Sequence, residues 1–231
     1  FCHSKCAYCD FYSMPYARAV EEYVQALTIE WRLRRHEVPG PFETIYIGGG
    51  TPSILAPKLL RHIIKALPTQ GLYEFTLETN PEDVTPDNVK AWRDMGINRI
   101  SMGVQSLDDE CLKRIGRRHD GATALHAMDT LQDAGISEIS LDVIYGLPGQ
   151  DLDSWHSTLD KLIEQRPQHL SAYALSLEPG TRLYAAASAG KWKPADDNLY
   201  VLMYDMLCKY TAQAGYLHYE ISNFALPGHT A

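Results

Sequence analysis

The chain lacks two features that would define its partners. No apolar run approaches the roughly 18–20 residues that cross a bilayer, and acidic residues outnumber basic ones. The 231 residues carry a formal net charge of −8 at pH 7. An acidic chain has no electrostatic footprint for nucleic acid or for an anionic membrane surface. We therefore expect no nucleic-acid partner and no direct contact with a membrane.

Internal linkers, low-complexity tracts and a visible signal peptide are also missing. One domain over residues 1–231 is the expectation, because α/β barrels of this length often form a single unit. The chain begins on Phe1 without a Met. We therefore expect it to be a fragment of a longer protein.

Cysteine is scarce and unevenly placed. Three of the five cysteines, Cys2, Cys6 and Cys9, follow the spacing Cys-x3-Cys-x2-Cys, and no fourth lies nearby. An odd, clustered set argues against a disulfide framework. It indicates a bound metal and a reducing compartment, which we take to be the cytoplasm. Cys111 and Cys208 lie among helical residues, where cysteine behaves as a small core hydrophobe.

Six strands are expected to alternate with helices along the chain. The strands, with the loops that follow some of them, are 44–47, 73–78, 99–106, 138–148, 169–177 and 217–225. Thr85 is a helix N-cap followed by a proline, Gly96 and Gly135 can close helices, and Pro39 begins a stop for the first helix. This alternation predicts parallel βαβ units with right-handed crossovers.

Polar residues or glycine follow most of these strands, as in the site of a (β/α) barrel. They are Gly48 to Thr51, Glu78 to Asn80, Gln105 and, within its own strand, Asp142. A doubly wound Rossmann sheet is the alternative. It would require Gly-x-Gly-x-x-Gly after a strand, and GGGTPS lacks the third glycine. We therefore predict a barrel.

Three clustered thiols can hold zinc or an iron–sulfur cluster. Structural zinc takes four ligands, and a fourth would have to be His3, Cys111 or Cys208. Ordinary electron-transfer clusters also use four protein ligands. Three cysteines in a short loop can instead hold three irons of a [4Fe–4S] cube and leave the fourth iron open. The thiols alone leave both hypotheses standing, and a zinc-stabilised binding module is one of them.

CHSKCAYC resembles the cysteine loop of radical S-adenosylmethionine (SAM) enzymes. GGGTPS resembles the segment of that family that contacts the methionyl amino group of SAM. ETNP, GVQS and DVIYGLP resemble its strand-end motifs, in the same order, so the resemblance covers nearly the full chain. It implies a partial (β/α)6 TIM-like barrel whose first strand is missing from this chain. It also implies a [4Fe–4S] cluster and SAM as cofactors, with reductive cleavage of SAM as the chemistry.

The resemblance implies roles for single residues as well. The three clustered cysteines would ligate the cluster. The residues that would contact SAM or face the cosubstrate are Tyr8, Gly49, Gly50, Thr51, Glu78, Gln105, Arg117 and Asp142. The guanidinium fork of Arg117 would pair with a carboxylate. Asp142 stands in an apolar strand, where a carboxylate is unfavourable unless something satisfies it.

Within that family the chain is most similar to the branch of HemN, the oxygen-independent coproporphyrinogen III oxidase, and HemW, a heme chaperone. The oxidase pattern has a further cysteine two positions after the third, where this chain has Phe11. CDF and HYEISNFALPG resemble the HemW pattern instead. This implies a chaperone that also binds heme and passes it to an acceptor hemoprotein, with membrane contact only through that acceptor.

The alternative function is SAM-dependent oxidative decarboxylation of coproporphyrinogen III in porphyrin biosynthesis, the work of an oxidoreductase. The resemblance leaves open which of the two the protein performs, and whether it is an enzyme. It also implies a further heme-related segment after residue 231, so we expect heme binding to need more than these residues.

Overall fold

The computed structural model describes residues 1–16, 19–38 and 40–231. Within these ranges seven strands form one sheet in the order β1-β2-β3-β4-β5-β7-β6. The strands are β1 Thr44–Ile47, β2 Glu74–Thr79, β3 Arg99–Gln105, β4 Glu138–Tyr145, β5 His169–Ala174, β6 Leu217–Glu220 and β7 Asn223–Ala225. Pro39, the first residue of the expected helix stop, lies outside the described residues.

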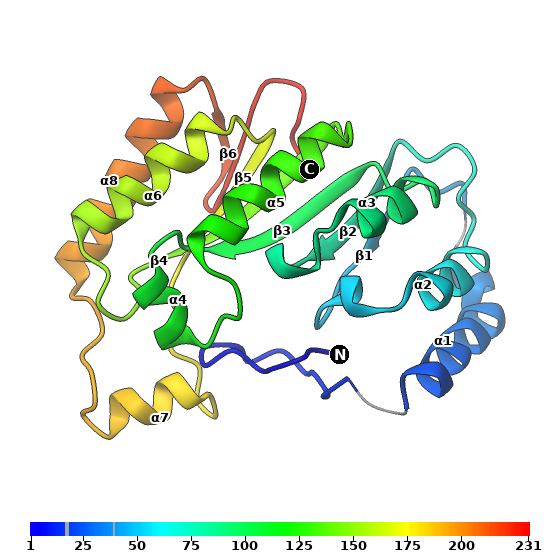
Figure 1. The fold of residues 1–231 in the computed structure, drawn as a ribbon, viewed down its shortest axis with the longest axis horizontal. Helices are drawn as coiled ribbons and strands as arrows, with labels where there is room; N and C mark the ends of the chain where they lie inside the picture. Colours follow the sequence, from blue (N-terminus) through cyan, green and yellow to red (C-terminus); the bar gives the residue numbers. More distant parts are fainter. Residues whose placement is uncertain (17–18, 39) are drawn as a thin grey trace.

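Strands β1 to β5 run parallel, and each pairs with the next strand along the chain. Helices fill the connections between them, as Figure 1 shows: α2 Pro57–Ile64, α3 Pro86–Arg93, α4 Asp109–Ile115, α5 Gly121–Asp133 and α6 Leu152–Glu164. Spatial order that follows chain order is the winding of a (β/α) barrel. The predicted α/β fold, a partial TIM-like barrel, is confirmed.

The expectation of a single parallel strand over 217–225 is wrong. These residues form a hairpin, in which β6 and β7 are antiparallel, and β7 is antiparallel to β5. Only Ile221 and Ser222 separate the two strands, whereas a parallel pair needs a crossover of a dozen or more residues. The turn is held by the Glu220 carboxylate, which accepts from the Ser222 N–H at 3.1 Å.

The remaining helices are α1 Val20–Arg34, α7 Arg182–Ser188 and α8 Asp197–Gln213, with short 3-10 turns at Arg35–Glu37, Pro52–Ile54 and Pro81–Asp83. The predicted cap at Thr85 is confirmed, because its side chain accepts from the Asn88 N–H at 3.2 Å. Helices α4 and α7 were not predicted from the sequence. Each has seven residues, too few to show an apolar period. No helix of the described ranges is long and apolar enough to cross a membrane.

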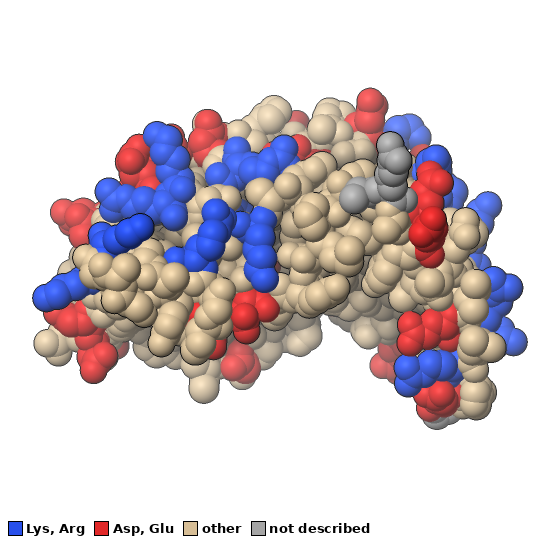
Figure 2. All heavy atoms as spheres, turned by 90° about the horizontal axis from the view of Figure 1, so that it is seen from below, with Lys and Arg blue, Asp and Glu red and all other residues tan. Residues whose placement is uncertain are grey.

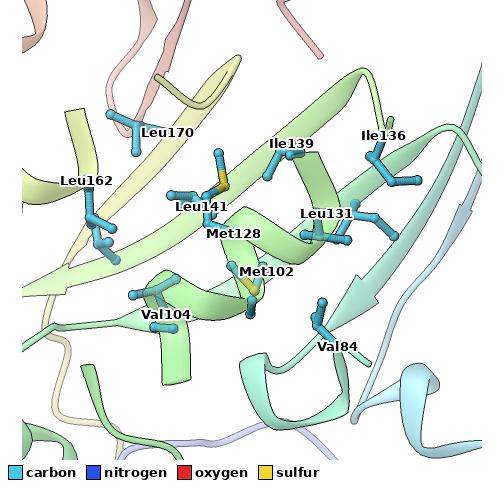
Figure 3. Close-up of a cluster of buried hydrophobic side chains, with 14 of the residues drawn as sticks. Val84, Met102, Val104, Met128, Leu131, Ile136, Ile139, Leu141, Leu162 and Leu170 are labelled. Atoms are coloured by element: carbon cyan, nitrogen blue, oxygen red, sulfur yellow. The ribbon is translucent and has the colours of Figure 1, made fainter. Parts of the chain in front are cut away.

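The main core lies between the sheet and the helices packed on one of its faces. Figure 3 shows Met102 and Val104 of β3 and Leu141 of β4 beside Met128 and Leu131 of α5. Each fully buried side chain of this size contributes about 1.5–3 kcal/mol. Because side chains alternate along a strand, the residues between these point to the opposite face, where the cavities lie.

Candidate cofactor site

A cavity of about 180 Å³ opens where the parallel strands end. Its lining includes every site residue that the sequence analysis singled out: Cys2, Cys6, Tyr8, Cys9, Gly49, Gly50, Thr51, Glu78, Gln105, Arg117 and Asp142. These residues come from the cysteine loop, from the ends of β1, β2 and β3, from the segment after α4 and from β4. The fold therefore gathers all of them around one space.

The two short helices hold the cysteine loop in place. The Ala7 N–H donates to the Ile115 carbonyl at the end of α4, over 2.8 Å. The Leu183 N–H at the start of α7 donates to the Ala7 carbonyl, also over 2.8 Å, and the Arg182 guanidinium donates to the Lys5 carbonyl. The loop that carries the three thiols is thus hydrogen-bonded to two elements far along the chain.

The glycine segment packs directly against the start of the cysteine loop. The Thr51 N–H donates to the Phe1 carbonyl at 2.7 Å, and the Thr51 hydroxyl lies 3.4 Å from the Cys2 sulfur. A Cβ on Gly50 would stand 2.5 Å from the Phe1 carbonyl oxygen. Glycine permits such a close backbone approach, because it has no Cβ. At Gly50 the backbone that lies this close is that of Phe1, the first residue of the chain.

Glu78 is held by two hydrogen-bond donors. Its carboxylate accepts from the Gly49 N–H at 2.9 Å and from the Tyr46 hydroxyl at 2.8 Å. Burial and the negative charge of Glu78 raise the pKa of Tyr46 above its ordinary value, so the hydroxyl keeps its proton and donates. The φ of 122° at Gly49 lies in a region that L side chains rarely adopt, so glycine suits this turn.

Asp142 faces the cavity from the middle of β4. Ser101 donates to its carboxylate at 3.2 Å. Burial raises the pKa of Asp142 to about 7, although the hydroxyls of Ser171 and Ser101 oppose the shift. Nearby, Gln105 ends β3 with a φ of 65°. Non-glycine residues in such strained conformations cluster at functional sites.

Arg117 directs its guanidinium into the site from the segment after α4. It donates to the Asn80 side-chain oxygen at 2.7 Å, to the Gly103 carbonyl, and to the Cys6 sulfur at 3.8 Å. Asn80 in turn donates to the Thr51 hydroxyl at 3.3 Å. Arg117 thereby ties the cysteine loop, the glycine segment and the end of β3 together.

The thiols fit a soft metal group. All five cysteines are free thiols, and burial raises the pKa of the Cys9 thiol. A coordinated metal would offset this, because metal binding deprotonates a thiol. In the ranges 1–16, 19–38 and 40–231 no three His, Cys, Asp or Glu side chains are arranged to hold one metal ion. Three thiolates that line one cavity without converging on a single ion position suit an iron–sulfur cluster, in which each thiolate takes its own iron, rather than zinc.

Of the two remaining cysteines, Cys111 is a buried core residue, as predicted. Cys208 is only half-buried, and its sulfur lies 4.0 Å from the Nδ1 of His218. The prediction that Cys208 is a small core hydrophobe is therefore partly right, because Cys208 packs against the main core but is only half-buried, on the side of α8 that faces β6.

Two residues of the site, Tyr46 and Ser101, were not predicted from the sequence, and Asn80 was predicted at a strand end without a role. Tyr46 holds Glu78, Asn80 joins Arg117 to Thr51, and Ser101 donates to Asp142. Alternation along β1 and β3 could have placed Tyr46 and Ser101 on the same face as the glycine loop and Gln105. Asn80 was already visible within the ETNP motif.

A second cavity of about 960 Å³ lies beside the first, along the inner face of the sheet. Seven residues line both cavities: Tyr8, Cys9, Phe11, Glu78, Ser101, Gln105 and Asp142. Ligand pockets typically measure about 300–1,000 Å³. A second, larger ligand could therefore lie next to whatever occupies the first cavity.

The outer surface near the site carries charges of both signs. Figure 2 shows the molecule from below, where Lys and Arg side chains lie among Asp and Glu side chains over the half that carries α4 and α7. The net charge of the whole chain is −8. This view therefore shows no surface of a single sign beside the cysteine loop.

The fold and the site define a partial (β/α) barrel protein that carries three thiols and a glycine turn at the carboxyl ends of its strands. Residues 1–162 match the model of the Radical SAM superfamily. The chain belongs to the radical SAM superfamily.

Particular relatives narrow the comparison. The heme chaperone HemW of Lactococcus lactis subsp. lactis (strain IL1403) is 36% identical over 99% of this chain and 61% of its own length. HemW of Escherichia coli (strain K12) is also 36% identical, with the same two coverages. The mitochondrial radical S-adenosyl methionine domain-containing protein 1 of Mus musculus is 35% identical over 99% of this chain and 53% of its own length.

The chain thus spans about three fifths of the length of the HemW relatives. Among solved structures, the coproporphyrinogen III oxidase HemN from Escherichia coli, described as a radical SAM enzyme, superposes with a TM-score of 0.86. It is 25% identical, and the match covers 98% of this chain and 54% of HemN.

Proposed function

We propose that this chain is the cofactor-binding core of a heme chaperone similar to HemW. Such a protein would hold a SAM-coordinated [4Fe–4S] cluster, bind heme and pass it to an acceptor hemoprotein. The observation that carries the proposal is the HemW name of relatives that are 33–36% identical over 99% of this chain. Phe11, which stands where the oxidase pattern has a cysteine, supports it.

The thiols of Cys2, Cys6 and Cys9 would hold three irons of the cluster. When bound, the cluster would supply the electron for one-electron reduction of the SAM sulfonium. The protein's part is to bind and orient. Glu78, fixed by Tyr46 and by a backbone N–H, would accept a hydrogen bond from the SAM amino group.

Other residues would define the rest of the SAM pocket. The ring of Tyr8 lines both cavities, where it would exclude water from the bound cofactor. Asp142 and Gln105 would contact the cosubstrate side, and Asp142 could do so as a donor, because its pKa of about 7 keeps part of the population protonated near neutral pH. Arg117 would pair with the carboxylate of SAM.

Decarboxylation of coproporphyrinogen III is the second candidate. The likeness to HemN at a TM-score of 0.86 favours it, and so does the adjoining cavity of about 960 Å³. A tetrapyrrole beside the SAM pocket would suit an oxidase as well as a chaperone. The oxidase is the second candidate because this chain has Phe11 where the oxidase pattern has a further cysteine.

One experiment separates the two. The full-length protein is reconstituted anaerobically with iron and sulfide, and heme binding and coproporphyrinogen decarboxylation are assayed in parallel. We expect the broad absorbance of an iron–sulfur cluster, stoichiometric heme and no turnover. Cys9→Ser should lose the cluster absorbance, and Cys111→Ser, which changes a core thiol, should keep it. Decarboxylase turnover would overturn the chaperone proposal. If the protein shows no heme binding and no turnover, both candidate functions are overturned.

The cellular setting follows from the same proposal. Three free thiols that bind a cluster need a reducing compartment, so we place the protein in the cytoplasm. Its partner would be a hemoprotein that accepts heme, and a membrane would be reached only through that acceptor. Fractionation of cells that express the tagged full-length protein tests this, and recovery from an oxidising compartment would contradict it.

A further inference from the structure

Arg117 makes a contact that the pairing with a SAM carboxylate does not explain. Its Nη1 donates to the sulfur of Cys6 at 3.8 Å, and Cys6 is one of the three clustered thiols. The left-handed Gly116, with a φ of 75°, ends α4 immediately before it and turns the chain back toward the cysteine loop. The contact is therefore built into the way α4 ends.

The guanidinium is fixed in this position. Its Nη2 donates to the Asn80 side-chain oxygen at 2.7 Å and to the Gly103 carbonyl, so the fork cannot turn away from Cys6 without losing both. An arginine guanidinium is not deprotonated in proteins. The side chain is a permanent cation held against a sulfur.

A cation at a ligand sulfur affects electron transfer in a defined direction. Reduction adds one negative charge to a cluster and its thiolates, and reduction potentials depend on hydrogen bonds to the sulfurs and on local charge. In a partly water-excluded site this interaction is stronger than in water. A fixed N–H donor with a positive charge therefore favours the reduced form.

We propose that Arg117 raises the reduction potential of the cluster through its hydrogen bond to Cys6. This inference rests on the proposed cluster-binding function. It assigns Arg117 a tuning role that operates before SAM binds, in addition to any contact with the SAM carboxylate. Within the described part of the chain, Arg117 alone donates a side-chain hydrogen bond to the Cys6 sulfur.

The test measures the midpoint potential of the reconstituted full-length protein without SAM, by anaerobic titration followed by electron paramagnetic resonance. Arg117→Gln removes the charge and should shift the reduction equilibrium at least tenfold toward the oxidised cluster, which for one electron is about 59 mV. Arg117→Lys keeps the charge without the fork and should shift it less. Arg118→Gln is the matched control, because Arg118 is 48% exposed and pairs with Glu82 at 3.8 Å, and it should leave the potential unchanged.

The outcomes separate this inference from the proposed function. If Arg117→Gln binds a full cluster and its midpoint potential is unchanged, the inference is overturned, but the proposed cluster site is not. Absence of a cluster in the unaltered protein overturns both. If Arg117→Gln holds no cluster, Arg117→Lys decides: a lowered potential supports the role, and an unaltered potential contradicts it.

Discussion

The two faces of β3 and β4 are built from alternate residues of the same strands and are opposite in character. On one face Ile100, Met102 and Val104 are fully buried among the helices. On the other face Ser101, Gly103 and Gln105 line a cavity. The strands thus separate two tasks by the direction of each side chain: one face stabilises the fold, and the other presents polar groups to ligands.

The two faces also differ in how favourable the surroundings are for the residues that they hold. The helix-covered face has apolar groups in apolar surroundings, which is favourable throughout. The cavity face holds a carboxyl group whose pKa has risen to about 7 at Asp142 and a residue with positive φ at Gln105. Strain of this kind persists where the surroundings over-determine it. Changes on the first face should therefore reduce stability, and changes on the second should alter binding.

The largest effect is expected on the covered face. Leu141→Ala removes a side chain that is 0% exposed and should lower the free energy of unfolding by about 2–5 kcal/mol, because it leaves a cavity. SAM affinity of the folded fraction should stay within twofold of the unaltered protein. Urea unfolding measures the free energy of unfolding, and equilibrium binding measures the SAM affinity. A loss of stability below about 1 kcal/mol would contradict the assignment of this face to the core.

Next comes the glycine segment at the cavity rim. Gly50→Ala would force a Cβ to within 2.5 Å of the Phe1 carbonyl, at about 1–3 kcal/mol of overpacking, and push the cysteine loop away. We expect at least tenfold weaker SAM binding by the reconstituted protein. Gly40→Ala is the control, because its nearest neighbour, in Phe42, would lie at an ordinary 3.5 Å. Equal binding by the two variants would show that the close approach is unimportant.

A pH effect is expected from the cavity face. The pKa of Asp142 is raised from 3.8 to about 7, so between these pH values the folded protein holds more protons than the unfolded chain. Its free energy of unfolding therefore falls as pH rises through that window. Asp142→Asn should remove this decline and be about 1–2 kcal/mol more stable than the unaltered apo-protein at pH 8.

Unfolding of the apo-proteins at pH 5 and pH 8 measures the difference in free energy of unfolding between Asp142→Asn and the unaltered protein. The advantage of the Asn variant should be smaller at pH 5, and its SAM binding should be weaker despite the gain in stability. Asp133→Asn, at the exposed last residue of α5, is a control for loss of a carboxylate outside the cavity. A constant advantage at both pH values would contradict the protonation of Asp142.

The smallest effect is expected at Tyr46. Tyr46→Phe removes one of two donors to Glu78 and should weaken SAM binding by about 1 kcal/mol, roughly fivefold. The protein should unfold at the same urea concentration, because the Tyr46 residue is 58% exposed. Tyr73→Phe, whose residue is 75% exposed, is the control and should bind as before. Binding unchanged in Tyr46→Phe would mean that Gly49 alone orients the carboxylate.

Much of this arrangement was predictable from local patterns. The alternation of strands and helices, the cap at Thr85 and eleven of the nineteen residues that line the first cavity follow from spacing, turn chemistry and motif resemblance. The hairpin of β6 and β7 did not, because LHYEISNFA reads as one unbroken strand and the two-residue turn carries no glycine. The helices α4 and α7 were missed because a seven-residue helix has no room for a period.

The sequence by itself identified candidate residues for the site and the strand ends on which several of them stand, because these depend on residue type, on motif resemblance and on the period-2 geometry of strands. Only the tertiary structure decided what each residue touches. Ile115 and Leu183 hold the cysteine loop through hydrogen bonds to Ala7, and Arg117 reaches Cys6 across 111 positions. Contacts of that kind depend on how the helices pack against the barrel, which no local pattern records.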